Sequence, residues 1–234
     1  MLPQLGTLDS EQYKNLCCSL YDAIPVLKKH SQCVLFPYGR SSLLFAWRHI
    51  DKIFTTQQQC PYIWLLAIDS DPRLSDKQFS NEFDTQWYDS TVPAAECVVL
   101  TRISQSSTGL THHWFCYEGQ TSDKPLGTAV SALFDRYQQS NSVDLHQFYA
   151  PYNGTDSLTA EWASMYHKLF PWVGEHTQIV MSGSFMGELG AGAGIYNLLH
   201  INERYQRGHY SGNTLQLESS EVVYRGAALY SWQE

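Results

Sequence analysis

The chain has 234 residues, of which 43% are hydrophobic and 14% aromatic, enough to bury the core of one large domain or of two small ones that share a core, which argues against a disordered chain. Its formal net charge is −8 and its lysines and arginines are scattered, which argues against a surface that follows a nucleic-acid backbone. The apolar runs are far shorter than the roughly 20 residues that span a bilayer, and the first residues lack the basic-then-apolar layout of a secretory signal, so we expect a cytoplasmic protein without a membrane span.

The first half of the chain contains one clear helix and two apolar strands. From Ser41, "SSLLFAWRHIDKIF" predicts a helix, with Ser41 or Ser42 as the N-cap and with apolar residues at helical spacing: Leu43, Ala46, Trp47, Ile50, Ile53 and Phe54. The runs "YIWLLAID" (62–69) and "AECVVLTRI" (95–103) have strand length and suit parallel strands that are covered on both faces. The polar stretches 70–93 and 104–124 predict loops.

The second half alternates between helices and strands. Two amphipathic helices are expected, over 126–140, with Val130, Leu133, Phe134 and Tyr137 on one side, and over 157–170. Residues 177–183 ("TQIVMSG") predict another strand, and 220–232 ("SEVVYRGAALYSW") a closing strand that breaks at Gly226. This alternation predicts an α/β fold with a mainly parallel sheet. No repeat or low-complexity linker divides the chain, so we expect a single domain over 1–234.

The glycine-rich stretch "GELGAGAGIYNLLHINERYQRG" (187–208) raises the question of a phosphate site. A dinucleotide fingerprint would need a third glycine where Ile195 stands, and a Walker loop would need a lysine, which this stretch lacks. The sequence favours packing instead: small residues at 190–194 let the first turn of a helix approach a neighbouring strand or subunit. Ile195, Leu198 and Leu199 are then expected to face a core, and Gly208 to end the helix.

The cysteines do not form a metal or disulfide framework. No C-x-x-C pair and no histidine at zinc-finger spacing accompanies them, so we expect reduced thiols that are mostly buried and no metal site. The six residues are Cys17, Cys18, Cys33, Cys60, Cys97 and Cys116.

Four segments, in chain order, resemble those of β-ketoacyl synthases. "PYGRSSLLFAWRHIDKI" with "YIWLLAID" is similar to the nucleophile helix and the strand after it, and "AAECVVLTRI" to the strand that opens the second half of these enzymes. "FYAPYNGTDSLTAEW" resembles the loop that carries the first catalytic histidine, and "SGSFMGELGAGAGIYNLLHINERYQRG" the late active-site segment with the second. The resemblance implies a thiolase-like fold, with a mainly parallel or mixed sheet covered by helices, that is truncated relative to a full ketosynthase and divergent over residues 1–35.

The resemblance also implies that the residues of the family's reaction are lost. These enzymes use a cysteine thiolate as acyl acceptor and two histidines that stabilise the enolate and the oxyanion. The motif matches put Gly39 at the nucleophile and Pro151 and Glu188 at the two histidines. Glycine cannot be acylated, proline offers no titratable group, and a carboxylate repels a developing oxyanion.

The register at the nucleophile rests on the serine pair Ser41–Ser42. A shift by one residue would put Tyr38 or Arg40 at this position, and neither can be acylated as cysteine is. With either register the resemblance implies a chain that is not an enzyme by itself and has no cofactor.

A shortened and degenerate copy of a ketosynthase resembles the chain length factors of type II polyketide and aryl polyene systems. The resemblance implies a heterodimer with an active ketosynthase, which receives its acyl chain from an acyl carrier protein. Bulky residues near the lost catalytic positions are then candidates for tunnel or interface walls, although ordinary core packing explains each of them as well. They are Phe36, Tyr38, Trp47, Phe185 and Met186.

Two other functions stay open. One is a stand-alone module that binds an acyl chain or a small molecule in the same cavity. The other is an enzyme that uses unrelated residues, although no spacing typical of a metal site or a triad connects them. Those residues are His112, His113, Cys116, Glu118, Asp69 and Asp71.

Overall fold

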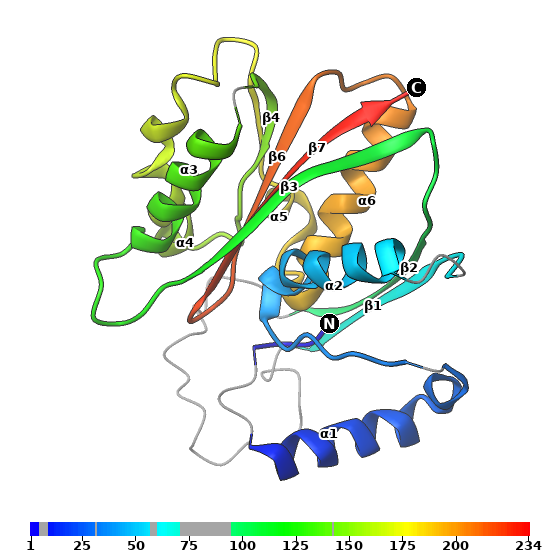
Figure 1. Ribbon diagram of the computed structural model, residues 1–234. Helices are drawn as coiled ribbons and strands as arrows, with labels where there is room; N and C mark the ends of the chain where they lie inside the picture. The colour runs from blue at the N-terminus through cyan, green and yellow to red at the C-terminus, as the bar shows by residue number, and fades with distance from the viewer. Residues whose placement is uncertain (5–8, 31, 57–59, 71–94, 142) are drawn as a thin grey trace.

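The computed structural model describes residues 1–4, 9–30, 32–56, 60–70, 95–141 and 143–234 (Figure 1). The strands are β1 (Ile63–Ser70), β2 (Glu96–Ile103), β3 (Gly109–Gly119), β4 (Leu145–Tyr149), β5 (Gln178–Val180), β6 (Asn213–Ser219) and β7 (Tyr224–Gln233). The α-helices are α1 (Ser10–Ala23), α2 (Ser42–Thr56), α3 (Thr128–Ser140), α4 (Asp156–Ala163), α5 (Gly183–Met186) and α6 (Ala193–Gln206). Shorter 3₁₀ helices are η1 (Pro25–Lys29), η2 (Gly39–Ser41), η5 (Tyr166–Leu169) and η6 (Gly190–Gly192).

The larger sheet has five strands in the order β3-β7-β6-β4-β5. Strand β4 runs parallel to β5 and β6, whereas β7 runs antiparallel to β6 and β3. The sheet is therefore mixed, which agrees with the predicted α/β fold and corrects the expectation of mainly parallel pairing.

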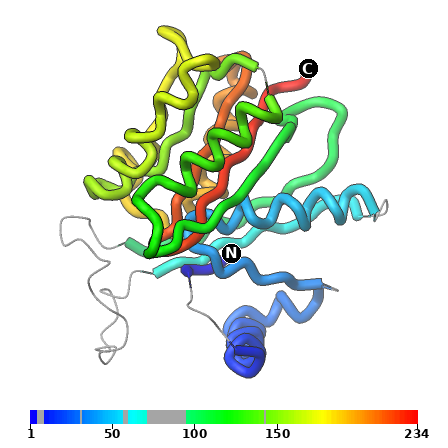
Figure 2. The backbone as a smooth tube through the Cα atoms, turned by 60° about the vertical axis from the view of Figure 1, so that its left-hand side comes forward, coloured from blue at the N-terminus to red at the C-terminus, as the bar shows by residue number. Residues whose placement is uncertain are grey.

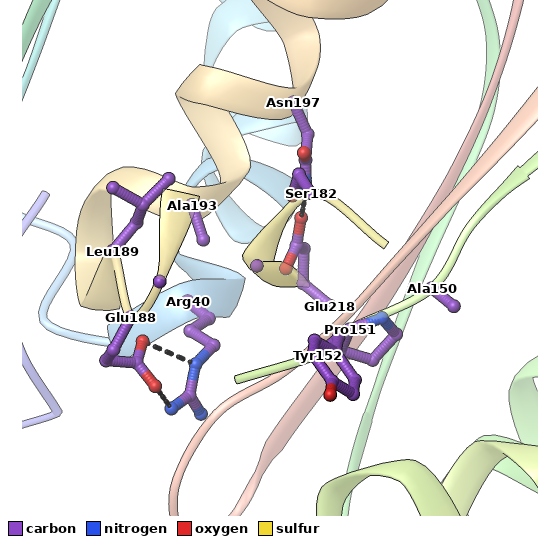
Figure 3. Close-up of a pocket in the computed structure, with 12 residues that line it drawn as sticks. Arg40, Ala150, Pro151, Tyr152, Ser182, Glu188, Leu189, Ala193, Asn197 and Glu218 are labelled. Atoms are coloured by element: carbon purple, nitrogen blue, oxygen red, sulfur yellow. Dashed lines mark hydrogen bonds and ion pairs between the residues drawn. The ribbon is translucent and has the colours of Figure 1, made fainter. Parts of the chain in front are cut away.

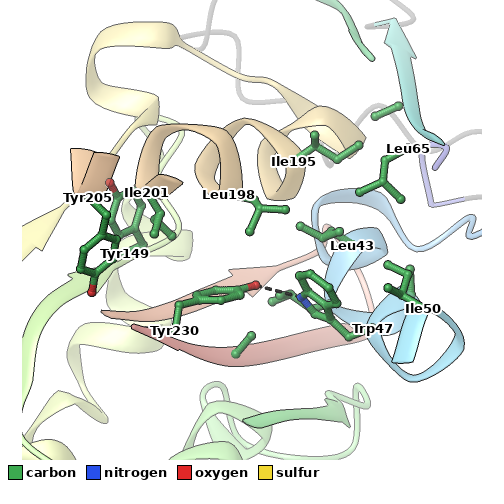
Figure 4. Packing of buried hydrophobic residues seen from close by; sticks show 14 of the residues in the cluster. Leu43, Trp47, Ile50, Leu65, Tyr149, Ile195, Leu198, Ile201, Tyr205 and Tyr230 are labelled. Atoms are coloured by element: carbon green, nitrogen blue, oxygen red, sulfur yellow. Dashed lines mark hydrogen bonds between the residues drawn. The ribbon is translucent and has the colours of Figure 1, made fainter. Parts of the chain in front are cut away.

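The elements stack in four layers. Helices α3 and α4 cover one face of the five-stranded sheet, α2 and α6 cover the other, and the β1–β2 pair lies on the far side of α2 and α6 (Figures 1 and 2). Side chains alternate along β7, so Ala227 and Leu229 pack towards α3 while Ala228 and Tyr230 pack towards α2. In the core between the sheet and α2, the Trp47 indole donates to the Tyr230 hydroxyl at 2.8 Å (Figure 4).

The β1–β2 pair differs from the prediction of parallel strands covered on both faces. The two strands are antiparallel, with Leu66 opposite Leu100. Leu65, Ala67 and Cys97 are buried on the face that meets α2 and α6, but Val98 on the opposite face is 71% exposed. Both faces of the pair carry apolar side chains, but the described helices pack on only one of these faces.

One predicted loop contains a strand. Residues 104–124 include β3, an edge strand of the larger sheet with a bulge between His112 and Trp114. The partly exposed side chains of an edge strand gave the polar pattern that had predicted a loop. Of the other predicted loop, Ser70 ends β1 and 71–93 lies outside the described residues.

Most expected helices form as expected. In α2 the predicted stripe supplies Leu43, Ala46, Trp47 and Ile50 to the core, and in α3 the four predicted residues are all buried. The serines at the start of α2 are not simple caps, because Ser41 donates to Glu218 O at 3.0 Å and Ser42 to Phe36 O at 2.8 Å. The predicted helix 157–170 is shorter and continues as the separate turn η5.

The closing strand and the N-terminal region also refine the predictions. Strand β7 runs without a break through Gly226, where a Cβ would lie 2.8 Å from Leu44 Cβ. The divergent N-terminal region contains α1, which starts with a capping box between Asp9 and Gln12 and has no buried residue. The strands β4 and β6 had not been predicted.

The expectation of mostly buried cysteines is wrong. All six thiols are free, but only Cys97 is buried, because the others lie on α1, on partly exposed strands or on described loops.

Candidate functional site

A small polar pocket lies where η2, the loop after β4, the segment before α6 and the end of β6 meet (Figure 3). The space enclosed between the side chains has about the volume of one water molecule. The lining residues are Arg40, Ala150, Pro151, Tyr152, Ser182, Gly183, Gly187, Glu188, Leu189, Ala193, Asn197 and Glu218.

The structure brings the three positions that the resemblance singled out to this pocket. Pro151 and Glu188 line it, and Gly39 directly precedes Arg40, which lines it too. Gly39 has a φ of 57°, and a Cβ there would overlap the carboxylate of Glu221. The positive φ therefore favours glycine at position 39, and a larger residue would also have to displace the Glu221 side chain.

An ion pair between Arg40 and Glu188 forms part of the pocket wall. Arg40 Nε donates to Glu188 Oε1 at 3.0 Å, and Arg40 Nη2 pairs with Glu188 Oε2. Arg40 Nη1 donates to Ser219 O at 3.2 Å and lies 3.3 Å from Glu221 Oε1. Glu188 also accepts from Asn153 Nδ2 at 2.9 Å. Arg40 thus connects the start of α2 with two segments that lie about 150 to 180 residues further along the chain.

Both members of this pair are charged. Burial lowers the pKa of the Arg40 guanidinium, but Glu188 and Glu221 together raise it further, so it lies above its ordinary value. Burial raises the pKa of Glu188, but the charge of Arg40 and hydrogen bonds from Arg40, Asn153 and Gly190 lower it more, so it lies below its ordinary value. The pocket therefore contains a fixed carboxylate beside a fixed guanidinium over the physiological pH range.

Glu218 is a second acidic group of the pocket. It is 1% exposed, and its Oε1 accepts from Asn197 Nδ2 at 2.7 Å and from Gln216 Nε2 at 2.9 Å. Burial raises the pKa of its carboxyl to about 7, although these two hydrogen bonds lower it. Glu218 therefore changes its protonation near neutral pH inside the fold.

The glycine-rich stretch binds a carboxylate of its own chain. Ala191 N donates to Asp69 Oδ2 at 2.6 Å, and Gly190 N donates to Glu188 Oε1 at 2.7 Å. A Cβ on Gly192 would overlap Cys97 Sγ, and one on Gly194 would lie 3.0 Å from Leu43 Cβ. The small residues thus let α6 begin against β1, β2 and α2, which confirms the packing interpretation.

The helix that follows behaves largely as expected. Ile195 and Leu198 are buried, and Gly208 has a φ of 69° just after the end of α6. The prediction for Leu199 is wrong, since 37% of it is exposed on the outer side of α6.

Gly190 offers a direct test of this packing. It has a φ of 49°, and a Cβ would overlap the Asp69 carboxylate. We expect Gly190→Ala to lower the free energy of unfolding by about 2 kcal/mol, from backbone strain and displacement of Asp69. Urea denaturation measures the effect, and Gly174→Ala is the control, because no atom lies within 4 Å of its Cβ position. Equal stability of the two variants would contradict the packing role.

The five candidate wall residues lie in different environments. Phe36 and Tyr38 are partly buried, and Tyr38 packs edge-on against Tyr224 with ring centroids 4.7 Å apart. Trp47 is 7% exposed and belongs to the core of this chain. Phe185 and Met186 are 59% and 44% exposed beside the pocket. Only the last two therefore present apolar side chains to the outside near Glu188.

The residues of the alternative enzyme hypothesis do not form a common site. His112 stacks on Trp47, with ring centroids 4.3 Å apart, and His113 Nε2 lies 2.6 Å from Ser231 Oγ. Arg136 forms an ion pair with Glu118 and hydrogen-bonds Cys116. Asp69 lies at the glycine-rich stretch, and Asp71 lies outside the described residues. Among the described side chains no group of three or more His, Cys, Asp or Glu could hold a metal ion.

Sequence reasoning missed the polar partners Arg40, Asn153, Glu218 and Glu221. Arg40 did carry a signal, because a cation at the start of an apolar helix opposes the helix dipole and needs a partner. Glu218 carried none, since its segment had not been predicted as a buried strand.

Comparisons with known proteins relate the fold, but not the sequence, to characterised proteins. No protein-family model and no curated protein matches the sequence. Among solved structures, the ishigamide ketosynthase/chain length factor is 16% identical, with a TM-score of 0.55 over 84% of this chain and 56% of that one. A type II polyketide acyl-carrier protein in complex with its ketosynthase bound to the hexaketide, AntDE:AntF, is 8% identical, with a TM-score of 0.60 over 92% of this chain and 64% of that one. Ketosynthase twelve from the bacillaene polyketide synthase of Bacillus amyloliquefaciens is 9% identical, with a TM-score of 0.54 over 84% and 46%.

These likenesses show a thiolase-like fold of the ketosynthase kind, as the sequence resemblance implied. The chain spans between about half and two thirds of the length of these three structures. Within the described part of the chain, no helix has both the length and the apolar character that a membrane crossing requires.

Proposed function

We propose that this chain is a non-catalytic partner subunit, a chain length factor, that forms a cytoplasmic heterodimer with an active β-ketoacyl synthase. The observation that carries the proposal is the Arg40–Glu188 ion pair, which forms part of the wall of the pocket where the resemblance places the catalytic residues. Gly39 and Pro151 flank this pair and offer neither a nucleophile nor a titratable group. The ketosynthase fold of the structural neighbours supports the same assignment.

The pocket is unsuited to condensation for two further reasons. Its enclosed space matches about one water molecule, so an acyl chain does not fit without displacing the ion pair. The sequence resemblance matches Glu188 to a position where the family needs a group that stabilises negative charge, and a carboxylate would raise the energy of an oxyanion instead. In this proposal the acyl cavity belongs to the synthase, and this chain supports one of its walls.

The acyl chain reaches the complex on an acyl carrier protein, which the proposal makes an indirect partner. A neighbour of the same fold is a ketosynthase in complex with a type II acyl carrier protein. Phe185 and Met186, which are exposed, are the proposed wall or interface residues, together with the partly buried Phe36 and Tyr38. The product is proposed to be a polyketide or an aryl polyene.

The proposal gives an expectation for expression without a partner. A subunit that buries an apolar surface in an obligate dimer is unstable alone. We expect most of this chain to be insoluble when it is expressed by itself and soluble when it is co-expressed with its synthase, as measured by the soluble fraction on a gel. A well-behaved monomer on size-exclusion chromatography would argue against an obligate partner.

An acylation experiment tests the loss of catalysis. The purified complex is incubated with an acyl-loaded carrier protein, and the intact masses of both subunits are measured. We expect the acyl group on the synthase subunit alone, and no adduct on either subunit when the synthase cysteine is replaced by alanine. An adduct on this chain that persists in that variant would overturn the non-catalytic assignment.

A further inference from the structure

The outer face of the β1–β2 pair is an apolar surface that no described element covers. It consists of the side chains that point away from α2 and α6, and we call it the outer face. Val98 and Leu100 are 71% and 59% exposed, and Trp64 and Tyr62 are 47% and 43% exposed. Leu66 and Ile68 lie between them and are partly buried. Apolar side chains gathered in this way on a soluble protein mark an interaction surface.

The outer face carries a negative charge at one end and a positive charge at the other. Along β2, every second residue points outwards, giving the series Glu96, Val98, Leu100, Arg102. Glu96 stands at one end beside Ser70, whose hydroxyl donates to Glu96 Oε1 at 3.0 Å. Arg102 stands at the other end, with its guanidinium 5.1 Å from the Tyr62 ring centre. The outer face therefore runs from an anion through an apolar middle to a cation.

Such a face is complementary to itself. Two copies can meet through their outer faces, related by a two-fold axis that lies between the two sheets and perpendicular to the strands. The strands of one copy then run in the opposite direction to those of the other. Glu96 of one copy then faces Arg102 of the other, and Val98 faces Leu100. Two-fold contacts of this kind use the same patch on both subunits.

We propose that the outer face of β1–β2 binds a second copy of this chain, in a two-fold contact that pairs Glu96 with Arg102. The other face of the pair packs on α2 and α6 through Leu65, Ala67 and Cys97, and among the described residues nothing packs on the outer face, which has the form of the inner layer of a sheet-on-sheet contact. The outer face points away from the glycine-rich stretch, which Asp69 binds on the inner face of the same strands. The contact does not depend on the proposed ketosynthase partner. With such a partner the assembly contains two copies of each subunit.

The patch is small, so the contact dissociates on dilution. Sedimentation velocity over a range of concentrations, on the soluble full chain and on any complex that copurifies with a ketosynthase, measures it. We expect a concentration-dependent doubling of mass, and at least a tenfold weaker association for both Arg102→Glu and Glu96→Arg. The double variant Glu96→Arg/Arg102→Glu restores association, because both pairs are reversed together.

Lys14→Glu on α1 is the matched control, since it makes the same change of charge on an exposed side chain elsewhere and leaves association unchanged. A single copy at every concentration would overturn the proposal. So would an association that the single variants leave intact, or one that the double variant does not restore. A complex that contains one ketosynthase and one copy of this chain at every concentration would contradict the outer-face contact while supporting the proposed function.

Discussion

Arg40→Met should lower the free energy of unfolding by about 3–5 kcal/mol, the usual cost of removing one member of a buried ion pair. The arginine side chain is 9% exposed and its partner Glu188 18% exposed, so little water replaces the lost charge. Without Arg40, the carboxylates of Glu188 and Glu221 lose their shared cation. Urea denaturation of the variant and the parent, in the same buffer and assembly state, gives the difference.

Two further variants separate the ion pair from general damage to the fold. Arg40→Met/Glu188→Gln removes both charges and should recover a large part of the lost stability, because the uncompensated carboxylate disappears. Lys28→Met breaks the exposed pair with Asp22, whose side chains are 55% and 77% exposed, and should cost less than about 1 kcal/mol. If Arg40→Met costs no more than Lys28→Met, the pair does not hold the pocket together.

Glu218→Gln should stabilise the chain above neutral pH by about 3 kcal/mol. Burial raises the pKa of Glu218 to about 7 from an ordinary value of 4.5, and each pKa unit corresponds to about 1.4 kcal/mol. Between these values the folded chain binds the proton that the unfolded chain has released, so this group makes stability fall as pH rises. The amide is neutral at every pH and keeps an acceptor for Asn197 and Gln216.

The measurement is the free energy of unfolding of parent and variant from pH 4.5 to pH 8. We expect the two to be similar at pH 4.5 and the advantage of Glu218→Gln to grow up to about pH 7 and then stay constant. Burial also raises the pKa of Asp69 to about 6, so below pH 6 this group too makes the free energy of unfolding fall as pH rises. The effect is the same in parent and variant and cancels in their difference. Glu203→Gln, on the exposed side of α6 with 51% of its side chain exposed, is the control. A constant difference over the whole pH range would mean that Glu218 does not titrate within the fold.

The sequence predicted the elements whose residues repeat at a clear period. Helices α2 and α3 carry four or more apolar residues at helical spacing. Four of the six residues predicted for the buried side of α2 and all four predicted for α3 are buried. Strand β6 was missed because it is buried on both faces while containing Thr214, Gln216 and Glu218. Thr214 donates to Gln147 Oε1 on β4, and Gln216 donates to Glu218 Oε1. A pattern of polarity cannot reveal a strand whose polar side chains are paired only in the tertiary structure.

The candidate site was likewise predicted only in part. Local motifs selected Gly39, Pro151 and Glu188. The fold brings Pro151 and Glu188 to one pocket together with Arg40, which directly follows Gly39. The partner of Glu188 was not predictable, because Arg40 lies 148 residues away in the chain and its side-chain direction is set by the fold. The carboxylate at position 188, expected to repel an oxyanion, has in addition a structural role as the partner of a buried arginine.

Co-purification tests whether this chain pairs with an active ketosynthase, as proposed. The chain is co-expressed with an intact ketosynthase from the same genome, with an affinity tag on the ketosynthase only, and the purified material is weighed by native mass spectrometry. We expect equal numbers of the two subunits in the complex, and condensation activity that requires the ketosynthase cysteine. A ketosynthase that purifies without this chain and is fully active alone would contradict the proposed pairing.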